Sequence, residues 1–428
     1  MIFFPLLFLL FWMFSTLVVY FWGPVFYSGA NNDLVVVLII FFCFMGVAGY
    51  FLGLGISKRL FFNKSQYIFK VNFYIFSFLT LASSIISNEV LVKSGSLFPS
   101  NYFLIFDGFS SLGDLYYNSK SESSGYGGSV LLSFFFGVLG PFRYFYIPYL
   151  ILHWPKIGFA KRIVGSMLVF LPVLTGVSIG TNKPIFDSAF ITAISFFVFL
   201  VYAKNFKDFQ LEYFCRKGIK VGFIFVMFSV IVFGYAMNGR GVTFEYIESN
   251  SPRGDISVSS DIAENGVSVS LVMLSHYIVQ GYYGLSLAIG KDFESTYGLG
   301  HSPFLLRQYE KVSGGSLSKN TYQEKIDNDW ASGVRWPSAF TFYANDVSFF
   351  GVPFVGFFQM MIFGICWYLG VYKGMRELIY SLPLHFQQVI FLSANNQVFS
   401  FADGFFAANY ILFALLLRMA VKGVGNAR

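Results

Sequence analysis

The chain alternates between long apolar runs and shorter polar segments. A helix that crosses a membrane needs about 20 largely apolar residues, and ten runs approach that length. We therefore predict an all-α polytopic membrane protein with about 10–12 transmembrane helices. The runs lie at Ile2–Trp22, Leu34–Ile56, Tyr67–Ile86, Ser129–Leu152, Ile163–Ile179, Ile185–Ala203, Val221–Met237, Val347–Tyr372, Phe386–Phe401 and Phe405–Ala420.

Two long polar segments interrupt this pattern, at 87–128 and 238–346. They divide the chain into an N-terminal bundle of about seven spans (1–237), a large loop (238–346) and about three C-terminal spans (347–428). Within the loop, 266–290 is apolar enough to be a further span. If this segment crossed the membrane, the basic residues that follow it would lie outside the cytoplasm, against the tendency of Lys and Arg to lie in cytoplasmic loops. We therefore favour a helix lying in the membrane interface. Both alternatives stay open.

Composition agrees with a membrane protein. The 428 residues are 56% hydrophobic and only 12% charged, and 58 Phe exceed the 51 charged residues (29 basic and 22 acidic). A soluble domain has about 25% charged residues, so a soluble fold is excluded. Disorder is excluded too, because it requires low hydrophobicity.

The net charge of +7 is explained by topology. Alternate connections between the predicted spans are basic, whereas 238–346 is rich in Asp and Glu. Because Lys and Arg accumulate in cytoplasmic loops, both termini are predicted to be cytoplasmic, and nucleic-acid binding is not expected. The N-terminus lacks a basic region and a small-residue cleavage site, so the first run is predicted to be a retained span. The basic connections contain Lys58, Arg59, Lys64, Lys156, Lys161, Arg162, Lys204, Lys207, Arg216, Lys217, Lys220, Lys373, Arg376, Arg418, Lys422 and Arg428.

Four cations stand out against the apolar background. Arg143 lies within a predicted span, after Pro141, which should kink the helix and open a polar pocket. Lys183 lies in the tight turn Gly180–Pro184, and Arg240 and Arg253 follow the seventh span. Such cations can bind phosphate groups. Snorkelling side chains and ordinary loop arginines are the alternatives.

Histidine and aromatic residues supply the other candidates. His276 can act as an acid or base near neutral pH, although a lone His among aromatics is more often structural; His301 is a weaker candidate. The segment 330–351 combines Trp and Tyr rings with Arg, Asn and Asp, which suits a sugar, although an interfacial aromatic belt has the same composition. No His, Cys or carboxylate spacing is typical of a metal site, and no metal or cofactor is expected.

Together these features resemble a known family. The number of spans, the loop of about one hundred residues before the last spans, and the segments His276–Leu287 and Trp336–Gly351 resemble the O-antigen polymerase (Wzy) family. The turn Gly180–Pro184 is similar to that family's Gly-x-x-basic element, with Lys183 where Arg is commoner.

The resemblance implies a metal-independent glycosyltransferase with a GT-C-like fold in the bacterial inner membrane. It would polymerise undecaprenyl-diphosphate-linked repeat units at the periplasmic face, using lipid-linked donor and acceptor glycans, with a chain-length regulator as a possible partner. His276 and Asp346 become the candidate bases. The diphosphate is assigned to Arg143, Lys183, Arg240 and Arg253. The glycan is assigned to Tyr282, Arg335, Trp336 and Tyr343.

Three rival functions remain. An O-antigen ligase would share the fold class but use a lipid A core acceptor. A lipid-linked oligosaccharide flippase would share location and substrate, but the long loop counts against it. A membrane O-acyltransferase lacks a supporting His/Arg motif near the start of the chain.

Overall fold

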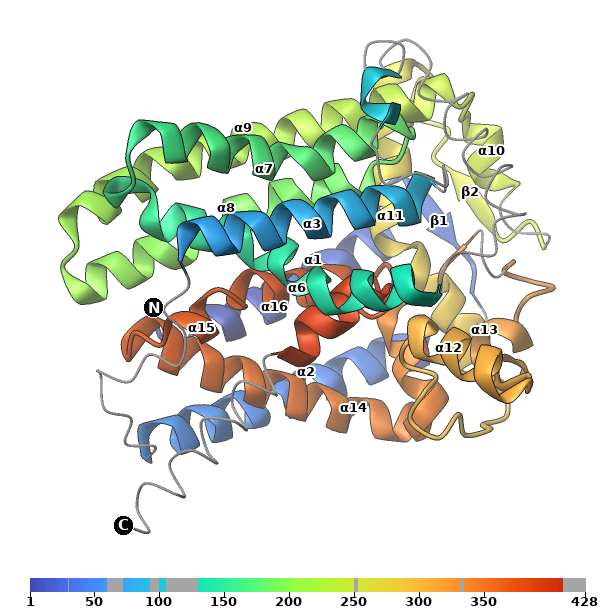
Figure 1. Ribbon diagram of the computed structural model, residues 1–428. Coiled ribbons are helices and arrows are strands. Elements are labelled where there is room, and N and C mark those ends of the chain that lie inside the picture. The colour runs from blue at the N-terminus through green and yellow to red at the C-terminus, as the bar shows by residue number, and fades with distance from the viewer. Residues whose placement is uncertain are drawn as a thin grey trace. The chain divides into compact units, whose positions relative to one another are not determined.

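The structure is a computed structural model that describes residues 1–29, 31–59, 72–92, 100–104, 130–249, 253–331 and 335–410. Its regular elements are helices, apart from one two-stranded ribbon (Figure 1). Among these residues, eight helices are long and apolar enough to cross a membrane. The predicted all-α, membrane-protein architecture is therefore confirmed. The eight are α1 (Phe4–Trp22), α2 (Asn32–Arg59), α3 (Phe73–Val92), α6 (Val130–His153), α7 (Phe159–Ser178), α8 (Lys183–Phe206), α9 (Phe209–Gly239) and α14 (Ala339–Trp367).

The predicted ninth span is wrong. Its region contains α16 (Leu382–Phe391), which has 10 residues and is followed by turns rather than further helix. Ten helical residues rise about 15 Å, half the thickness of a bilayer core. The tenth span, predicted at Phe405–Ala420, begins as helix at 402–410, and its remainder lies outside the described residues.

Backbone contacts divide the chain into two compact units, each assembled from three separate stretches. The first unit combines Met1–Leu60, Gly241–Ile365 and Gln388–Phe401. The second unit combines Phe61–Arg240, Cys366–Gln387 and Ala402–Arg428. The predicted boundary at 237/238 lies close to a unit boundary. The predicted boundary at 346/347 instead falls within α14.

The first unit is built around α11 (Gly266–Ala288), which packs against α1 and α2. Asn265 caps this helix together with Ser268 in a reciprocal capping box. The second half of α11 is buried on all sides, from Val279 to Ala288. This pattern is typical of a core helix, not of an amphipathic helix resting on a membrane surface.

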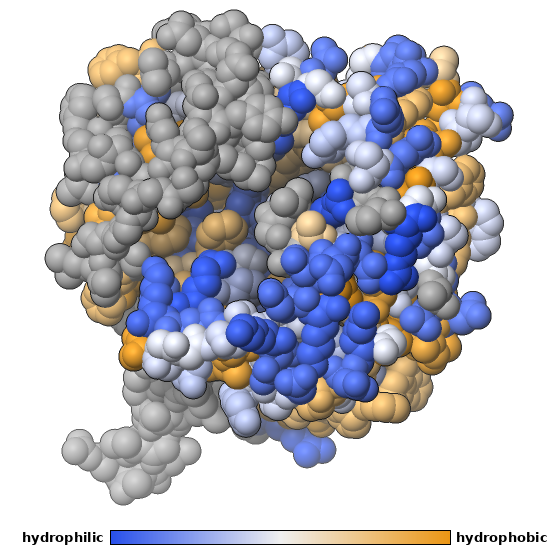
Figure 2. Space-filling view, turned by 90° about the vertical axis from the view of Figure 1, so that its right-hand side faces the viewer, coloured by the Kyte–Doolittle hydropathy of each residue, from blue (hydrophilic) through white to orange (hydrophobic). Residues whose placement is uncertain are grey.

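The first unit also contains a two-stranded ribbon and several short helices. Strand β1 (Val25–Tyr27) pairs antiparallel with β2 (Ile256–Val258), and α10 (Phe244–Glu248) packs on β2. Figure 2 shows the face on which the loop segments lie, where hydrophilic side chains gather. The short helices of the loop are α12 (Pro303–Ser313), η3 (Leu317–Asn320) and α13 (Tyr322–Lys325).

The second unit is a bundle of α3, α6, α7, α8 and α9. Helices α8 and α9 form an antiparallel hairpin, and α6 packs against α3 and α8. A Cβ atom on Gly140 of α6 would lie 2.4 Å from the Cα of Asp403. Only glycine therefore lets the helical segment 402–410 approach α6 this closely. The short α15 (Arg376–Ile379) and α16 also belong largely to this unit.

Candidate functional site

A buried ion pair joins two distant parts of the second unit. Arg143 of α6 donates from Nη2 to Asp403 Oδ2 and from Nη1 to Ser87 Oγ, each at 2.5 Å. The Arg143 side chain is 13% exposed and that of Asp403 is 2% exposed. A charge at membrane depth is tolerated only when it is paired or hydrated. The carboxylate of Asp403 therefore supplies the negative charge that stabilises Arg143 inside the bundle.

A second ion pair, between a partly exposed lysine and a buried carboxylate, lies at the start of α8. Lys183, the first residue of this helix, donates from Nζ to Asp187 Oδ2 at 2.5 Å. The other oxygen of Asp187 accepts a hydrogen bond from Gln387 Nε2, also at 2.5 Å. Both oxygens of Asp187 are therefore occupied, and its carboxylate holds Lys183 within the bundle.

Arg240 supports the same turn from the end of α9. Its Nη2 donates to the carbonyl oxygen of Gly180 at 2.6 Å. Gly180 has φ of +66°, a left-handed conformation that favours glycine. Three of the four predicted phosphate ligands, Arg143, Lys183 and Arg240, thus belong to one unit, and two of them meet at one turn.

The fourth predicted phosphate ligand, Arg253, belongs to the first unit. It forms a bidentate pair with Asp329, at 2.8 Å from Nε and 2.6 Å from Nη2. This hydrogen bonding raises the pKa of Arg253 above its ordinary value. Its side chain is 45% exposed. The structure therefore gives Arg253 a carboxylate partner within its own unit.

Little free space remains around these ion pairs. A cavity of about 20 Å³ touches Arg143, Tyr144 and Asp187, which is room for about one water molecule. Elsewhere in the same unit, Asn88 exchanges two hydrogen bonds with Asn101, which also donates to Ser178 at 2.6 Å. A phosphate could enter this interior only if a carboxylate gave up its cation or the helices moved.

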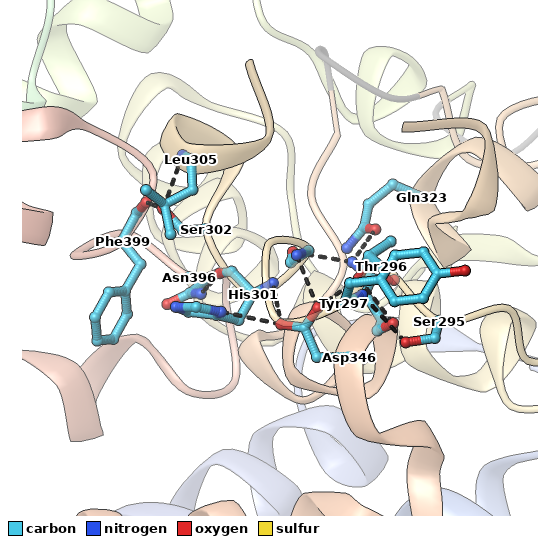
Figure 3. Close-up of polar contacts among 12 residues, drawn as sticks. Ser295, Thr296, Tyr297, His301, Ser302, Leu305, Gln323, Asp346, Asn396 and Phe399 are labelled. Atoms are coloured by element: carbon cyan, nitrogen blue, oxygen red, sulfur yellow. Dashed lines mark hydrogen bonds and ion pairs between the residues drawn. The ribbon is translucent and has the colours of Figure 1, made fainter. Parts of the chain in front are cut away.

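A separate polar cluster surrounds Asp346 in the first unit (Figure 3). Its carboxylate accepts four hydrogen bonds from the loop segment 296–301. The donors are Thr296 Oγ1 at 2.5 Å, the Gly300 and His301 backbone N–H groups at 2.8 Å, and His301 Nδ1 at 2.9 Å. Because Nδ1 donates to the carboxylate, the neutral ring leaves Nε2 as the acceptor. His301 is 30% exposed, so this pair has the geometry of a base and its orienting carboxylate.

Neighbouring amides fix this pair in place. Asn345 donates from Nδ2 to the Gly300 carbonyl at 3.1 Å and to Gln323 Oε1 at 2.9 Å. Asn396, from the wrongly predicted ninth span, donates to the His301 carbonyl at 2.5 Å. The polar residues of that run therefore hold a loop of the first unit.

His276 lies elsewhere in the first unit and is fully buried. Its Nδ1 shares a hydrogen bond of 2.8 Å with the Tyr27 hydroxyl, and the two rings stack. Burial lowers the pKa of His276 to about 3. A base must reach the proton that it removes, so this placement does not support His276 as the base, and His301 becomes the better candidate.

The predicted glycan residues separate into two groups. Tyr282 and Tyr343 are buried, and the Tyr282 hydroxyl bonds Thr16 at 2.9 Å. Because both side chains are buried in the first unit, their placement gives no support to a glycan-facing role. Trp336 is 37% exposed, and Arg335 lies 5.4 Å from the centre of the Trp330 ring. Trp336 and Arg335 therefore remain candidates for binding the glycan.

Sequence reasoning missed two carboxylates, Asp187 and Asp403. Asp187 lies inside a predicted span, where an ionisable residue is itself a signal. Asp403 lies between two predicted spans and had no comparable signal. Only the structure shows its role, because Asp403 contacts Arg143, which lies 260 positions away in the sequence.

Comparisons of this chain with family models, with curated proteins and with solved structures find no match. Within the described ranges, no group of three or more His, Cys, Asp or Glu side chains could hold a metal ion. The functional argument therefore depends on the site geometry and on the sequence resemblance.

Proposed function

We propose that this protein is a bacterial inner-membrane glycosyltransferase of GT-C type that polymerises undecaprenyl-diphosphate-linked repeat units at the periplasmic face. The observation that carries the proposal is the set of cations Arg143, Lys183 and Arg240 inside one helical bundle. Arg143 and Lys183 are each paired with a carboxylate within this bundle. Such buried charge is costly and is usually retained for a function.

In this proposal the cations stabilise the leaving group. The bond between the donor's anomeric carbon and the diphosphate oxygen breaks, and its electron pair stays on that oxygen. Fixed positive charge lowers the energy of this developing negative charge. A lipid diphosphate binds by exchanging places with Asp187 or Asp403, which hold Lys183 and Arg143 in its absence.

His301 is the base that the described residues offer. A hydroxyl of the acceptor sugar forms the new bond to the anomeric carbon and loses its proton. Within the first unit, His301 Nε2 is able to accept a proton from a sugar hydroxyl. Asp346 stabilises the resulting imidazolium through its hydrogen bond to Nδ1. Removing a general base typically costs a factor of about 10²–10⁴ in rate.

The test is polymerisation by purified protein supplied with lipid-diphosphate-linked repeat units and analysed as a ladder on a gel. Arg143→Gln and Lys183→Ala should each reduce polymer yield by about 100-fold or more, and His301→Gln should reduce turnover with little change in KM. Arg216→Gln is the matched control, because this exposed arginine forms an ion pair with Glu212 one helical turn away, its only ion pair within the described part of the chain. Control-level polymer from both cation variants would refute the diphosphate role.

A deletion strain separates the proposed function from its rivals. Loss of a polymerase leaves single repeat units on the lipid A core, whereas loss of a ligase or flippase leaves none. A normal ladder in the deletion strain would reject all three functions.

A further inference from the structure

A long groove lies on the surface of the second unit, away from the ion pairs. It has a volume of about 780 Å³ and is formed by α7 and the preceding turn η2 (Trp154–Lys156). Its apolar wall follows one face of α7 through Phe159, Ile163, Met167 and Phe170 to Leu174. At 1.5 Å per residue this wall is about 22 Å long, comparable to one extended lipid chain.

One end of the groove carries a cation on an aromatic ring. The Arg162 guanidinium lies 5.6 Å from the centre of the Trp154 ring, and its Nε donates to the Trp154 carbonyl at 3.2 Å. Trp154 also stacks on Phe214, with ring centres 5.8 Å apart. Among the described residues, no hydrogen-bond acceptor meets the Nη atoms of Arg162. The ring contact and the Nε hydrogen bond thus hold the Arg162 guanidinium in place, and its two Nη groups keep their N–H donors available for a ligand.

Most of the charged residues around this end of the groove are basic. Lys156 is 62% exposed and lies 3.3 Å from Asp208, and Lys161 packs over the Tyr74 ring at 4.9 Å. Basic residues mark this end of the bundle as the one predicted to face the cytoplasm. A Trp and an Arg beside a long apolar groove match a lipid whose phosphate lies at that interface.

We infer that this groove binds an anionic glycerophospholipid of the cytoplasmic leaflet, with its phosphate on Arg162 and one acyl chain along α7. The cationic end of the groove is the end predicted to face the cytoplasm, which favours a lipid of that leaflet over the polymerase substrate. The diphosphate of that substrate is proposed to bind at Lys183, which lies beyond the opposite end of α7. The lipid site does not depend on the proposed function.

Native mass spectrometry of the purified protein, titrated with phosphatidylglycerol or phosphatidylcholine, tests this site. The wild type should retain phosphatidylglycerol preferentially. Arg162→Ala should weaken that retention about fivefold, as expected for one cation near an anionic lipid. Met167→Trp should weaken it by filling the groove. Arg216→Ala is the control, because it removes a cation from the same end of the bundle but outside the groove.

Two results would overturn the inference. One is unchanged phosphatidylglycerol retention in both groove variants. The other is displacement of phosphatidylglycerol from the wild type by a polyprenyl phosphate at a much lower concentration than phosphatidylglycerol of a different mass requires, which would make the groove a substrate-tail site. A melting temperature within a few degrees of the wild type confirms that each variant is folded.

Discussion

At the scale of single residues, Arg143 and Asp403 show how a bundle of apolar helices keeps a charge. The Asp403 side chain is 2% exposed and that of Arg143 is 13% exposed, and the two form an ion pair at 2.5 Å. Breaking a buried pair by removing one member leaves an uncompensated charge, which costs about 3–5 kcal/mol. Replacing both members with apolar residues is often neutral or stabilising.

We therefore expect Asp403→Leu alone to lower the melting temperature of the detergent-solubilised protein strongly. Arg143→Met combined with Asp403→Leu should restore it close to the wild-type value while leaving polymerisation abolished. A double variant as unstable as the single one would show that the pair contributes more to folding than its burial predicts. An active double variant would remove Arg143 from the proposed mechanism.

His276 gives a prediction about pH. Its folded-state pKa is lowered to about 3 by burial, whereas an unfolded His titrates near 6.5. The unfolded state therefore binds more protons between these values, so stability is complete above about pH 6.5 and falls as the pH falls. At pH 5 the loss is about 2 kcal/mol. His276→Gln should remove this part of the pH dependence, as measured by melting temperatures at pH 7.5 and pH 5; equal slopes for both proteins would contradict it.

The sequence revealed one half of each buried pair. Arg143 and Lys183 were visible because a cation stands out in an apolar run. The partner of Arg143 was not visible, because nothing local connects Asp403 to a residue 260 positions away. The partner of Lys183 was overlooked, although Asp187 lies only four residues away inside a predicted span. His301 was underestimated for a similar reason, since its orienting carboxylate comes from another element. His276 was overestimated, because the residues that bury it are also distant in sequence.

At the scale of elements, the length and composition of apolar runs predicted eight helices well. The run at Phe386–Phe401 failed because apolar content does not distinguish a crossing helix from a short buried helix followed by a turn. Its Asn and Ser residues form contacts inside the protein, as Asn396 does with His301. Asp346 was expected in a loop but lies near the start of α14, because that helix begins eight residues before the apolar run.

Helix α14 changes direction at Ser348, two residues after Asp346. Ser348 has φ of 57° and ψ of 172°, a region that is essentially restricted to glycine and costs about 1–3 kcal/mol. Ser348→Gly should therefore raise the melting temperature, and Ser348→Val should lower it. Calorimetry of the two variants measures both effects, and a lower melting temperature for Ser348→Gly would show that the serine side chain has a compensating role.

At the scale of the whole molecule, the prediction concerns which side of the membrane each segment faces. Lys58 and Lys217 are exposed at ends predicted to be cytoplasmic, and Lys311 is exposed in the segment predicted to be periplasmic. In a variant without Cys43, Cys215 and Cys366, Lys311→Cys should react with a membrane-impermeant maleimide in cells with a permeabilised outer membrane. Lys58→Cys and Lys217→Cys should react only after lysis. Early labelling of Lys217→Cys would reverse the proposed orientation.

Sequence patterns could not predict that the chain forms two units, each assembled from three separate stretches. Hydropathy marks where helices begin and end, but it does not say which helices pack together. The first unit takes in segments from the beginning, the middle and the end of the chain. The second unit is also assembled from three stretches, and two of them meet through the close approach of Gly140 to Asp403, which has no periodic signature.

The ion pair between Arg143 and Asp403 also has a consequence for biosynthesis. The ribosome makes Asp403 260 residues after Arg143, which at about 5–20 residues per second is a delay of roughly 13–50 s. During that interval the Arg143 helix must enter the bilayer without its carboxylate, at an insertion cost of about 2.5–3.5 kcal/mol for the arginine. Nascent chains of this protein therefore pass through a stage in which an insertase, a chaperone or early neighbours such as Ser87 must shelter an unpaired arginine.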